Sequence, residues 1–266
     1  MKYDYQETTN DLLKRIDIHS QFGSRNIDVW MLDLLPLKAG QQLLDVGCGA
    51  GKQCFSYFDH LKGQADILGA DVNQELLEQA RKENGHRNAN IRFMELNFNQ
   101  PFELESNTFD LVSCCFAIYY AEDIPFTIRE MHRVLKPGGV LFTSGPMPDN
   151  KKLFYDIIME ATGKTIPPMP GSSRYASEIY TTILNTFSKV DLHIFENPLT
   201  FEAVEPFIEY TRASLSEDRK LWKSFFVDKD DFNRIMAQIE AVATQRLKSE
   251  GKLVMTKVVG GILATK

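Results

Sequence analysis

The chain has 266 residues, of which 43% are hydrophobic and 25% are charged. These proportions are ordinary for a globular protein, and the length allows one α/β domain with insertions or one domain with a small cap. The formal net charge of -6 argues against a nucleic-acid partner, because binding to phosphates requires a basic face.

The cysteines and the apolar runs indicate in which cellular compartment the protein is expected. Four cysteines lie in apolar segments without the CxxC spacing of a metal site, which predicts reduced, buried thiols and no metal. No apolar run reaches the ~20 residues that span a bilayer, the first residues lack a signal-peptide core, and no strongly basic amphipathic helix is evident. We therefore expect a cytoplasmic protein without a membrane partner.

The first 39 residues are predicted to form a helical cap. Apolar residues at positions 27, 30, 31, 34 and 35 recur at the spacing of one helix face. A shorter helix is expected before them and should end near Gly23.

From residue 40 onward, predicted strands alternate with predicted helices, which is typical of βαβ units with a parallel sheet and helices on both faces. The helix from residue 73 should be capped by Asn73 and end at Gly85. The strands are expected at 42–46, 66–70, 91–94, 109–115 and 140–144, and the helices at 52–61, 73–83 and 124–135.

After residue 145 the pattern is less regular. A loop is expected over the proline-rich residues 165–173, and an all-helical insertion over residues 197–251. The other predicted elements are helices at 154–162 and 175–187 and strands at 189–195 and 253–264.

The most informative segment is LLDVGCGAG at residues 43–51, where an apolar strand leads through Asp45 into a turn with glycine at every second position. Glycine permits positive φ angles and a close approach of the backbone to a ligand. Asp71 ends the next predicted strand, where a carboxylate can bind both hydroxyls of a ribose. The two features together predict a nucleoside-containing ligand.

The spacing of the glycines narrows the choice of ligand. A P-loop requires glycine six residues before Lys52, where Val46 stands instead. A dinucleotide-binding turn leaves two residues before its third glycine to wrap a pyrophosphate, whereas here only Ala50 separates Gly49 from Gly51. The tighter turn favours S-adenosylmethionine, and a nicotinamide dehydrogenase fits least.

Four segments in the order LDVGCGAG, Asp71, FDLV (109–112) and RVLKPGG (133–139) resemble the motifs of class I S-adenosylmethionine-dependent methyltransferases. The resemblance covers about residues 40–145 and implies a Rossmann-like, seven-stranded, mostly parallel sheet with an antiparallel last strand. It would divide the chain into the cap at 1–39, a cofactor-binding core at 40–196 plus 252–266, and a helical lid at 197–251 before the last strand.

The resemblance also implies which residues bind S-adenosylmethionine. The glycine turn would contact the methionine part of the cofactor, with Asp45 near its ammonium, and Asp71 would bind the ribose. Asn97 stands where the family often has an aspartate at the adenine. The expected set is Asp45, Gly47, Gly49, Gly51, Asp71, Val72, Asn97, Phe98 and Cys115.

Residues for the methyl acceptor are less specified, because methyl transfer requires chiefly alignment and needs a base only when the acceptor must lose a proton. Candidate catalytic residues are Tyr119 and Tyr120 after the fourth predicted strand, and His19. An anionic acceptor would suit a guanidinium clamp, for which the candidates are Arg174 and the pair Tyr210 and Arg212. Each of these residues also fits a packing or surface role.

We therefore expect transfer of a methyl group from S-adenosylmethionine to an O, N or C atom of a small metabolite that could be anionic. Two alternatives stay open: another transfer or cyclisation that uses S-adenosylmethionine on the same fold, and a non-catalytic nucleoside-binding module. The expected partner is a small-molecule acceptor, and the chain could be a monomer or a homodimer.

Overall fold

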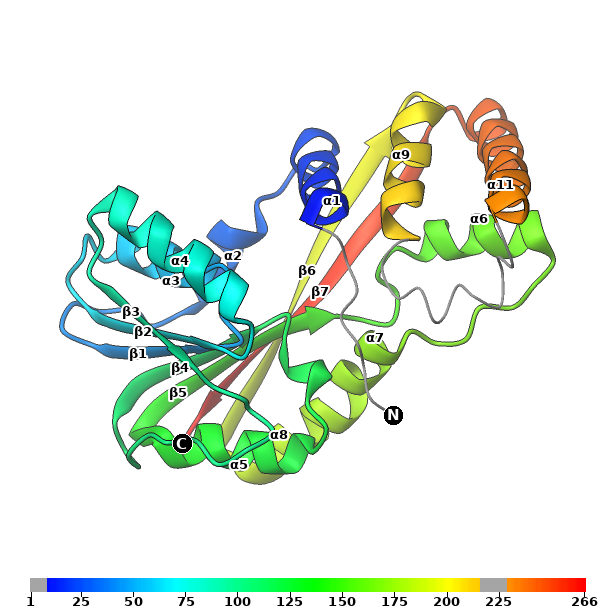
Figure 1. The fold of residues 1–266 in the computed structure, drawn as a ribbon. Coiled ribbons are helices and arrows are strands. Elements are labelled where there is room, and N and C mark those ends of the chain that lie inside the picture. Colours follow the sequence, from blue (N-terminus) through cyan, green and yellow to red (C-terminus); the bar gives the residue numbers. More distant parts are fainter. Residues whose placement is uncertain (1–8, 216–228) are drawn as a thin grey trace. The chain divides into compact units, whose positions relative to one another are not determined.

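The computed structural model describes residues 9–215 and 229–266 (Figure 1). The chain divides into two compact units. One, the sheet unit, comprises Ile27–Pro148, Met169–Phe195 and Val259–Lys266, and the other, the helical unit, comprises Met1–Asn26, Asp149–Pro168 and Glu196–Val258.

The strands form one sheet in the order β3-β2-β1-β4-β5-β7-β6. Neighbours among β1 to β5 are parallel, and β7 runs antiparallel to β5, so the predicted Rossmann-like sheet is confirmed. The strands are β1 (Gln42–Val46), β2 (Asp66–Asp71), β3 (Ile91–Glu95), β4 (Phe109–Cys115), β5 (Leu135–Pro146), β6 (Lys189–Phe201) and β7 (Leu253–Thr265).

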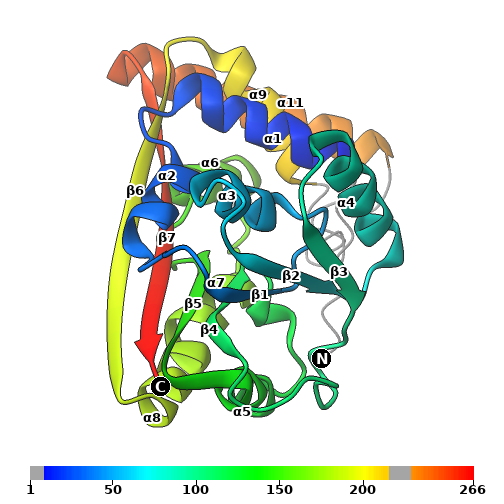
Figure 2. The same ribbon diagram turned by 90° about the vertical axis from the view of Figure 1, so that its left-hand side faces the viewer.

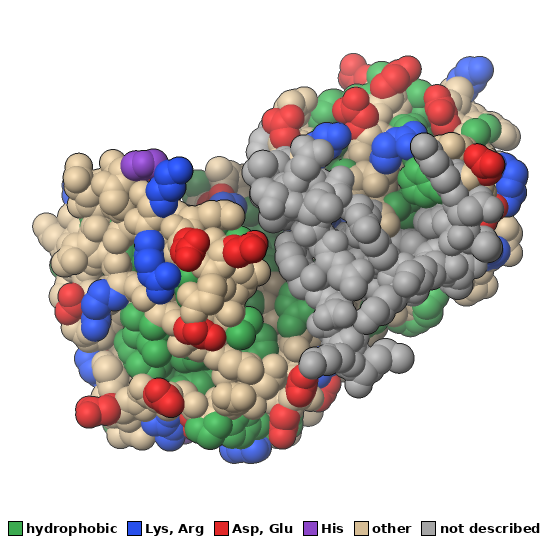
Figure 3. Space-filling view, viewed as in Figure 1, with side chains coloured by type: hydrophobic (Ala, Val, Ile, Leu, Met, Phe, Trp, Pro, Cys, Tyr) green, Lys and Arg blue, Asp and Glu red, His purple; other side chains and the backbone are tan. Residues whose placement is uncertain are grey.

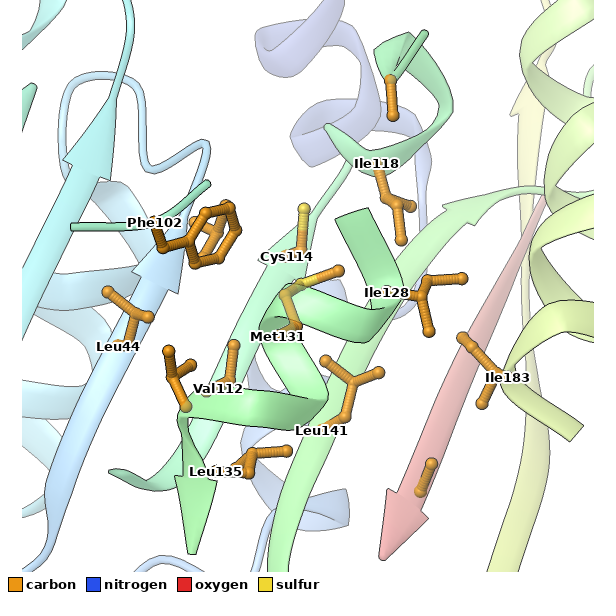
Figure 4. Packing of buried hydrophobic residues seen from close by; sticks show 14 of the residues in the cluster. Leu44, Phe102, Val112, Cys114, Ile118, Ile128, Met131, Leu135, Leu141 and Ile183 are labelled. Atoms are coloured by element: carbon orange, nitrogen blue, oxygen red, sulfur yellow. The ribbon is translucent and has the colours of Figure 1, made fainter. Parts of the chain in front are cut away.

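The sheet unit has helices on both faces because successive side chains of its central strands point to opposite sides. Leu43 packs with α2, α3 and α4, whereas its neighbour Leu44 packs with α5 and α8 (Figures 2 and 4). The helices of this unit are α2 (Ile27–Leu34), α3 (Lys52–His60), α4 (Gln74–Arg87), η1 (Ile118–Tyr120), α5 (Ile124–Val134), α7 (Pro170–Arg174), η2 (Tyr175–Ile179) and α8 (Tyr180–Thr186).

Several predicted boundaries in the sheet unit were wrong. Asn73 caps α4 as expected, but the helix continues through Gly85 and ends at Asn88, whose left-handed backbone closes it. The loop expected at residues 165–173 gives way to helix at Pro170, which suits the first position of a helix. Strand β5 begins at Leu135 rather than Val140, because Phe109 at the start of β4 pairs with Leu135.

The helical unit holds α1 (Thr9–Phe22), α6 (Lys152–Thr162), α9 (Val204–Ser214) and α11 (Lys229–Glu250), with the end of β6 and the start of β7. A separate apolar cluster holds this unit together, and Phe154, Phe207 and Ile239 are fully or almost fully buried in it. Helix α11 ends at Glu250, directly before Gly251, whose φ is 77°.

The two units are bounded differently from the three predicted segments. Residues 27–39 belong to the sheet unit, because Met31 and Leu35 pack in the cluster that contains Leu43. Residues 149–168 belong with 1–26 and 196–258, because Phe154 and Ile157 pack with α9 and α11 residues. A lid role for the helical insertion stays a prediction.

The charge on the surface and the length of the apolar helices bear on possible partners. On the face shown in Figure 3, basic side chains are interspersed with acidic ones. Within the described part of the chain, no helix is both long enough and apolar enough to cross a membrane.

Candidate functional site

The glycine turn between β1 and α3 has the backbone that its sequence predicts. Gly47, Gly49 and Gly51 have φ angles of 72°, 54° and 82°, in the left-handed region that glycine adopts without strain. At Gly47 a Cβ would also lie only 2.6 Å from the Cβ of Ala117. The backbone N–H groups of Gly47 and Cys48 both donate to the carbonyl of Ala70, which ties the turn to the end of β2.

Asp71 lies against this turn, as expected for a residue that shares a ligand with it. Its Oδ2 accepts a hydrogen bond from the N–H of Gly49 at 2.8 Å, and its Oδ1 accepts one from the N–H of Asn73 at 2.8 Å. These bonds orient the carboxylate, and each oxygen keeps a lone pair for a further donor. The half-buried Asp71 can therefore accept two hydroxyl groups of a ligand beside the turn.

Asp45 lies beneath the turn and is 2% exposed. The Ser113 hydroxyl donates to its Oδ1 at 2.6 Å, and the Cys54 thiol donates to its Oδ2 at 3.7 Å. Burial raises the pKa of Asp45 to about 7, the nearby Asp71 carboxylate raises it too, and the two hydrogen bonds oppose this rise. A cation bound at the turn would favour the charged form of this carboxyl group.

The other expected cofactor residues also follow the carboxyl ends of parallel strands. Val72 is 56% exposed directly after Asp71, as an apolar surface for a flat ring would be. The Asn97 Oδ1 accepts the N–H of Asn99 at 3.0 Å, so it orders the turn after β3. The Phe98 ring lies 3.8 Å from where a Cβ of Gly47 would be.

Cys115 ends β4, and the backbone after it is strained. Phe116 has a φ of 55°, which is unusual for an aromatic residue and costs roughly 1–2 kcal/mol. Its N–H donates to the carbonyl of Ser144 at 2.8 Å, and this bond helps to hold the strained conformation. The next residue, Ala117, is the one that approaches Gly47.

Sequence reasoning missed Ser113, Phe116 and Ala117. Ser113 was recognisable as the polar residue in the middle of an apolar strand, because a buried hydroxyl needs a partner. No sequence pattern announces the left-handed Phe116 or the approach of Ala117, because both depend on how β4 and β5 place the loop.

The candidate acceptor residues of the sheet unit lie after β4. The half-buried rings of Tyr119 and Tyr120 are adjacent on η1, with centroids 4.7 Å apart. Arg174 is brought to the same place, but its Nη1 donates to the carbonyls of Tyr119 and Ala121, each at 2.8 Å. Its Nε pairs with Glu178 at 3.2 Å. The geometry of Arg174 is thus that of a residue that positions η1, and a role in binding an anion stays a prediction.

The remaining candidates lie in the helical unit. His19 on α1 contacts the ring of Tyr210 on α9 edge-on, with centroids 5.5 Å apart. Arg212 is exposed, and its guanidinium lies 5.7 Å from the ring centroid of Phe232. The structure therefore pairs Tyr210 with His19 and does not bring Tyr210 together with Arg212, because residues two apart on a helix point to different sides.

Comparison with known proteins shows which family the sequence around this site resembles. Residues 43–139 match the family model of the methyltransferase domain. A demethylmenaquinone methyltransferase of Staphylococcus haemolyticus is 33% identical over 136 residues, which cover 48% of this chain and 56% of the relative. A ubiquinone/menaquinone biosynthesis C-methyltransferase of Serratia proteamaculans is 27% identical over 187 residues, covering 66% of this chain and 70% of the relative.

The chain spans about half the length of the first curated relatives that it matches. Among solved structures, the YcgJ protein of Bacillus subtilis superimposes with a TM-score of 0.58 at 14% identity, covering 90% of this chain and 97% of that one. The [4+2]-cyclase SpnF superimposes with a TM-score of 0.54 at 15% identity, covering 98% and 97%. At these identities the structural likeness concerns the fold alone.

Proposed function

Because residues 43–139 belong to the class I S-adenosylmethionine-dependent methyltransferases, we propose that the protein transfers the methyl group of S-adenosylmethionine to a small-molecule acceptor. The observation that carries the proposal is the turn of three left-handed glycines that is bonded to Asp71 and lies over the buried Asp45. This arrangement supports binding of an amino acid joined to a nucleoside.

The donors around Asp45 support the place of the methionine ammonium. Among the described residues, only the neutral hydroxyl of Ser113 and thiol of Cys54 donate to this carboxyl group. A buried carboxylate needs a charged partner or takes up a proton. An ammonium group would supply that charge, and the strained backbone after Cys115 would bring a carbonyl to the same group.

In the proposed complex Asp71 holds the ribose and Val72 packs on the adenine, while Asn97 and Phe98 border the ring. The cofactor supplies a methyl group that is already activated on a sulfonium. The task of the chain is then to place an acceptor atom in line with that methyl group and to exclude water. Tyr119 and Tyr120 are the residues of the sheet unit best placed to contact the acceptor.

The first acceptor class to test follows from the names of the relatives. Some relatives are named as ubiquinone/menaquinone biosynthesis C-methyltransferases and others as demethylmenaquinone methyltransferases. A demethylated hydroquinone, methylated on carbon, is therefore the first candidate. General-base catalysis by His19 has less support, since a pKa lowered to about 2 makes its imidazole a weak base at neutral pH.

The test is to incubate the purified protein with S-adenosylmethionine and demethylated hydroquinones, and to identify the nucleoside product by mass spectrometry. We expect S-adenosylhomocysteine together with an acceptor heavier by one methylene. Methylthioadenosine would instead indicate attack at another carbon of the sulfonium. Cofactor binding without any product, across hydroquinone, phenol and amine acceptors, would contradict the proposal and favour a cyclase or a binding module.

A further inference from the structure

Strand β6 lies at the border of the sheet, and another strand pairs with it on one side only. In the strand order it has β7 as its single neighbour among the described strands. The N–H of Ser188, directly before β6, donates to the carbonyl of Thr265 in β7 at 3.0 Å, so β7 lies along the start of β6. Figure 2 shows β6 as the outermost strand, with β7 on its inner side. The outer side of an edge strand presents backbone N–H and C=O groups with which a further strand can pair.

The chain that follows α1 bonds to the second half of β6. Gly23 forms an isolated antiparallel bridge with Leu199, and the Nη1 of Arg25 donates to the carbonyl of Glu196 at 2.9 Å. Among the described residues, no such bond from this segment reaches β6 before Glu196. The open edge of the sheet is therefore the segment 189–195, which belongs to the sheet unit and has Leu192 as its central residue.

The open edge carries apolar side chains that are exposed. Leu192 is 37% exposed and Ile194 is 44% exposed, and both point to the same face because side chains two residues apart share a face of a strand. The opposite charges of Lys189 and Asp191 lie 3.2 Å apart and offset each other, so these two residues give the segment no net charge that would repel a second copy. Large apolar side chains along an unpaired edge favour pairing with another strand.

The open edge is complementary to itself when two copies pair antiparallel around Leu192. In this register Leu192 faces Leu192 of the partner subunit, and Val190 faces Ile194 of the partner subunit, so one face of the joint is apolar throughout. On the other face, Asp191 lies opposite His193 of the partner subunit. A carboxylate accepts a hydrogen bond from an imidazole N–H, and a two-fold axis forms this pair twice. The register also uses the whole open edge, because residue 189 then faces residue 195.

The neighbouring symmetric registers lack this match. Pairing around residue 191 would place Asp191 directly opposite Asp191 of the partner subunit, and like charges in that position repel each other. Pairing around residue 193 would place the apolar Val190 opposite the charged Glu196 of the partner subunit. A register centred between two residues would put facing side chains on opposite faces of the sheet. Among these registers, only the one centred on Leu192 is complementary on both faces.

We propose that the protein forms a two-fold symmetric homodimer in which the open edges of two copies pair antiparallel around Leu192 and join the two sheets into one. The partner is a second copy rather than a strand of another protein, because the complement of each face lies in the same seven residues. The proposal does not rest on the proposed function, since neither test below measures methyl transfer. A dimer without methyl transfer would overturn the proposed function alone, and methyl transfer by a monomer would overturn this inference alone.

Sedimentation velocity of the full chain at roughly 1–200 µM tests for the dimer, whose fraction should rise with concentration by mass action. Leu192→Lys should weaken dimerisation by about tenfold or more, because two like charges would face each other at the axis. The matched control is Val254→Lys, since Val254 is a strand residue of similar exposure (39%) outside the open edge, and it should change dimerisation by no more than about twofold. A parent protein that stays monomeric, or an equal loss in Val254→Lys, would overturn the proposal.

Cross-linking tests the register. Leu192→Cys places two thiols opposite each other at the axis, so oxidation with copper phenanthroline in air should give a covalent dimer on a non-reducing gel. Ile194→Cys is the matched control on the same face, because the two Cα atoms at position 194 would lie roughly 13 Å apart, too far for a disulfide. The parent protein reports any cross-linking by its own cysteines, of which Cys48, Cys54 and Cys114 are buried. No covalent dimer from Leu192→Cys, or as much from Ile194→Cys, would overturn the proposed pairing.

Discussion

Single carboxyl groups determine how the proposed cofactor site responds to charge. Asp71 is held by two backbone N–H groups, so it is oriented before any ligand arrives. Asp45 is buried and has a raised pKa, so its charge depends on what binds nearby. Asp71 therefore supplies hydrogen-bond acceptors that are already oriented, whereas the protonation state of Asp45 changes with pH and with the bound ligand.

Replacing Asp71 with alanine should weaken binding of S-adenosylmethionine by about 1–3 kcal/mol, because charge-assisted hydrogen bonds to the ribose would be lost. Isothermal titration calorimetry measures the change. Asp66→Ala is the control, since Asp66 is exposed at the opposite end of the same strand. Parent-like affinity in Asp71→Ala would show that the ribose is bound elsewhere.

Asp45 should make the unliganded protein less stable as the pH rises. Its pKa is 3.8 when unperturbed and about 7 in the fold, so the folded state holds the proton more tightly. The stability linked to this proton is fully present below about pH 4 and is lost as the pH rises through about 7. Asp45→Asn should remove that loss and raise the free energy of unfolding at pH 8, by at most ~4 kcal/mol.

Urea denaturation of both proteins at pH 5 and pH 8 measures this difference. The gain in Asp45→Asn should be larger at pH 8, while its affinity for S-adenosylmethionine should fall. A gain that is independent of pH would mean that the carboxyl group does not titrate in this range.

At the scale of elements, the turns and strand ends position the site more than the helices do. The glycine turn requires both a left-handed backbone and room for Ala117. In the helical unit, Asn197 of β6 joins the chain after α1, since its Oδ1 accepts the N–H groups of Ser24 and Arg25 and its Nδ2 donates to the Arg25 carbonyl. Both features are tight contacts that a single substitution can test.

Gly47→Ala should destabilise the protein and abolish measurable cofactor binding, because the new Cβ would lie 2.6 Å from the Ala117 Cβ. Gly40→Ala is a matched control: Gly40 has a φ of 82° and nothing within 4 Å of the added atom. The control should lose only the ~1 kcal/mol of a left-handed alanine and bind the cofactor normally. Thermal denaturation and calorimetry separate the two effects, and equal behaviour of both variants would refute the close approach.

Asn197→Ala should lower the free energy of unfolding by about 2–4 kcal/mol, since Asn197 is 3% exposed and its loss leaves backbone groups of Ser24 and Arg25 unpaired. Chemical denaturation measures the loss. The exposed Asn185 of α8 provides the control, and its replacement by alanine should change stability by no more than ~0.5 kcal/mol. A loss as small as in the control would show that this contact is dispensable.

Some of the helices could be predicted from the spacing of apolar residues in the sequence. Apolar spacing predicted the helical insertion over residues 197–251, in which α9 and α11 lie, although residues 197–201 continue strand β6. The predicted pairing of Tyr210 with Arg212 was wrong, because residues two apart in the sequence do not share a helix face. The predicted end of α4 at Gly85 was wrong, because a helix tolerates glycine when the neighbouring residues continue it.

At the scale of the whole molecule, the chain divides into two compact units, and the matched family model falls in one of them. The family model covers residues 43–139, all within the sheet unit, whereas α1, α6, α9 and α11 lie in the helical unit. The cofactor should therefore protect segments of the sheet unit.

Hydrogen exchange measured by mass spectrometry can locate the bound cofactor. S-adenosylmethionine should slow exchange in the segment from Gly47 to Gly51 and around Asp71, because a ligand stabilises the segments that hold it. Unchanged exchange in both segments would contradict the proposed cofactor site.

By itself, the sequence determined the class of the fold and the nature of the donor site. Alternating apolar runs require a parallel sheet with covered faces, and three glycines at that spacing require a backbone that other residues adopt only with strain. Both features depend only on residues that are close in the sequence, so the sequence alone is enough to predict them. Tertiary structure alone decided that Ser113 bonds to Asp45, that Phe116 is strained, and that the Lys151 ammonium lies 5.8 Å from the centroid of the Tyr210 ring. Such contacts join residues that are distant in the chain, so they depend on packing rather than on local propensity.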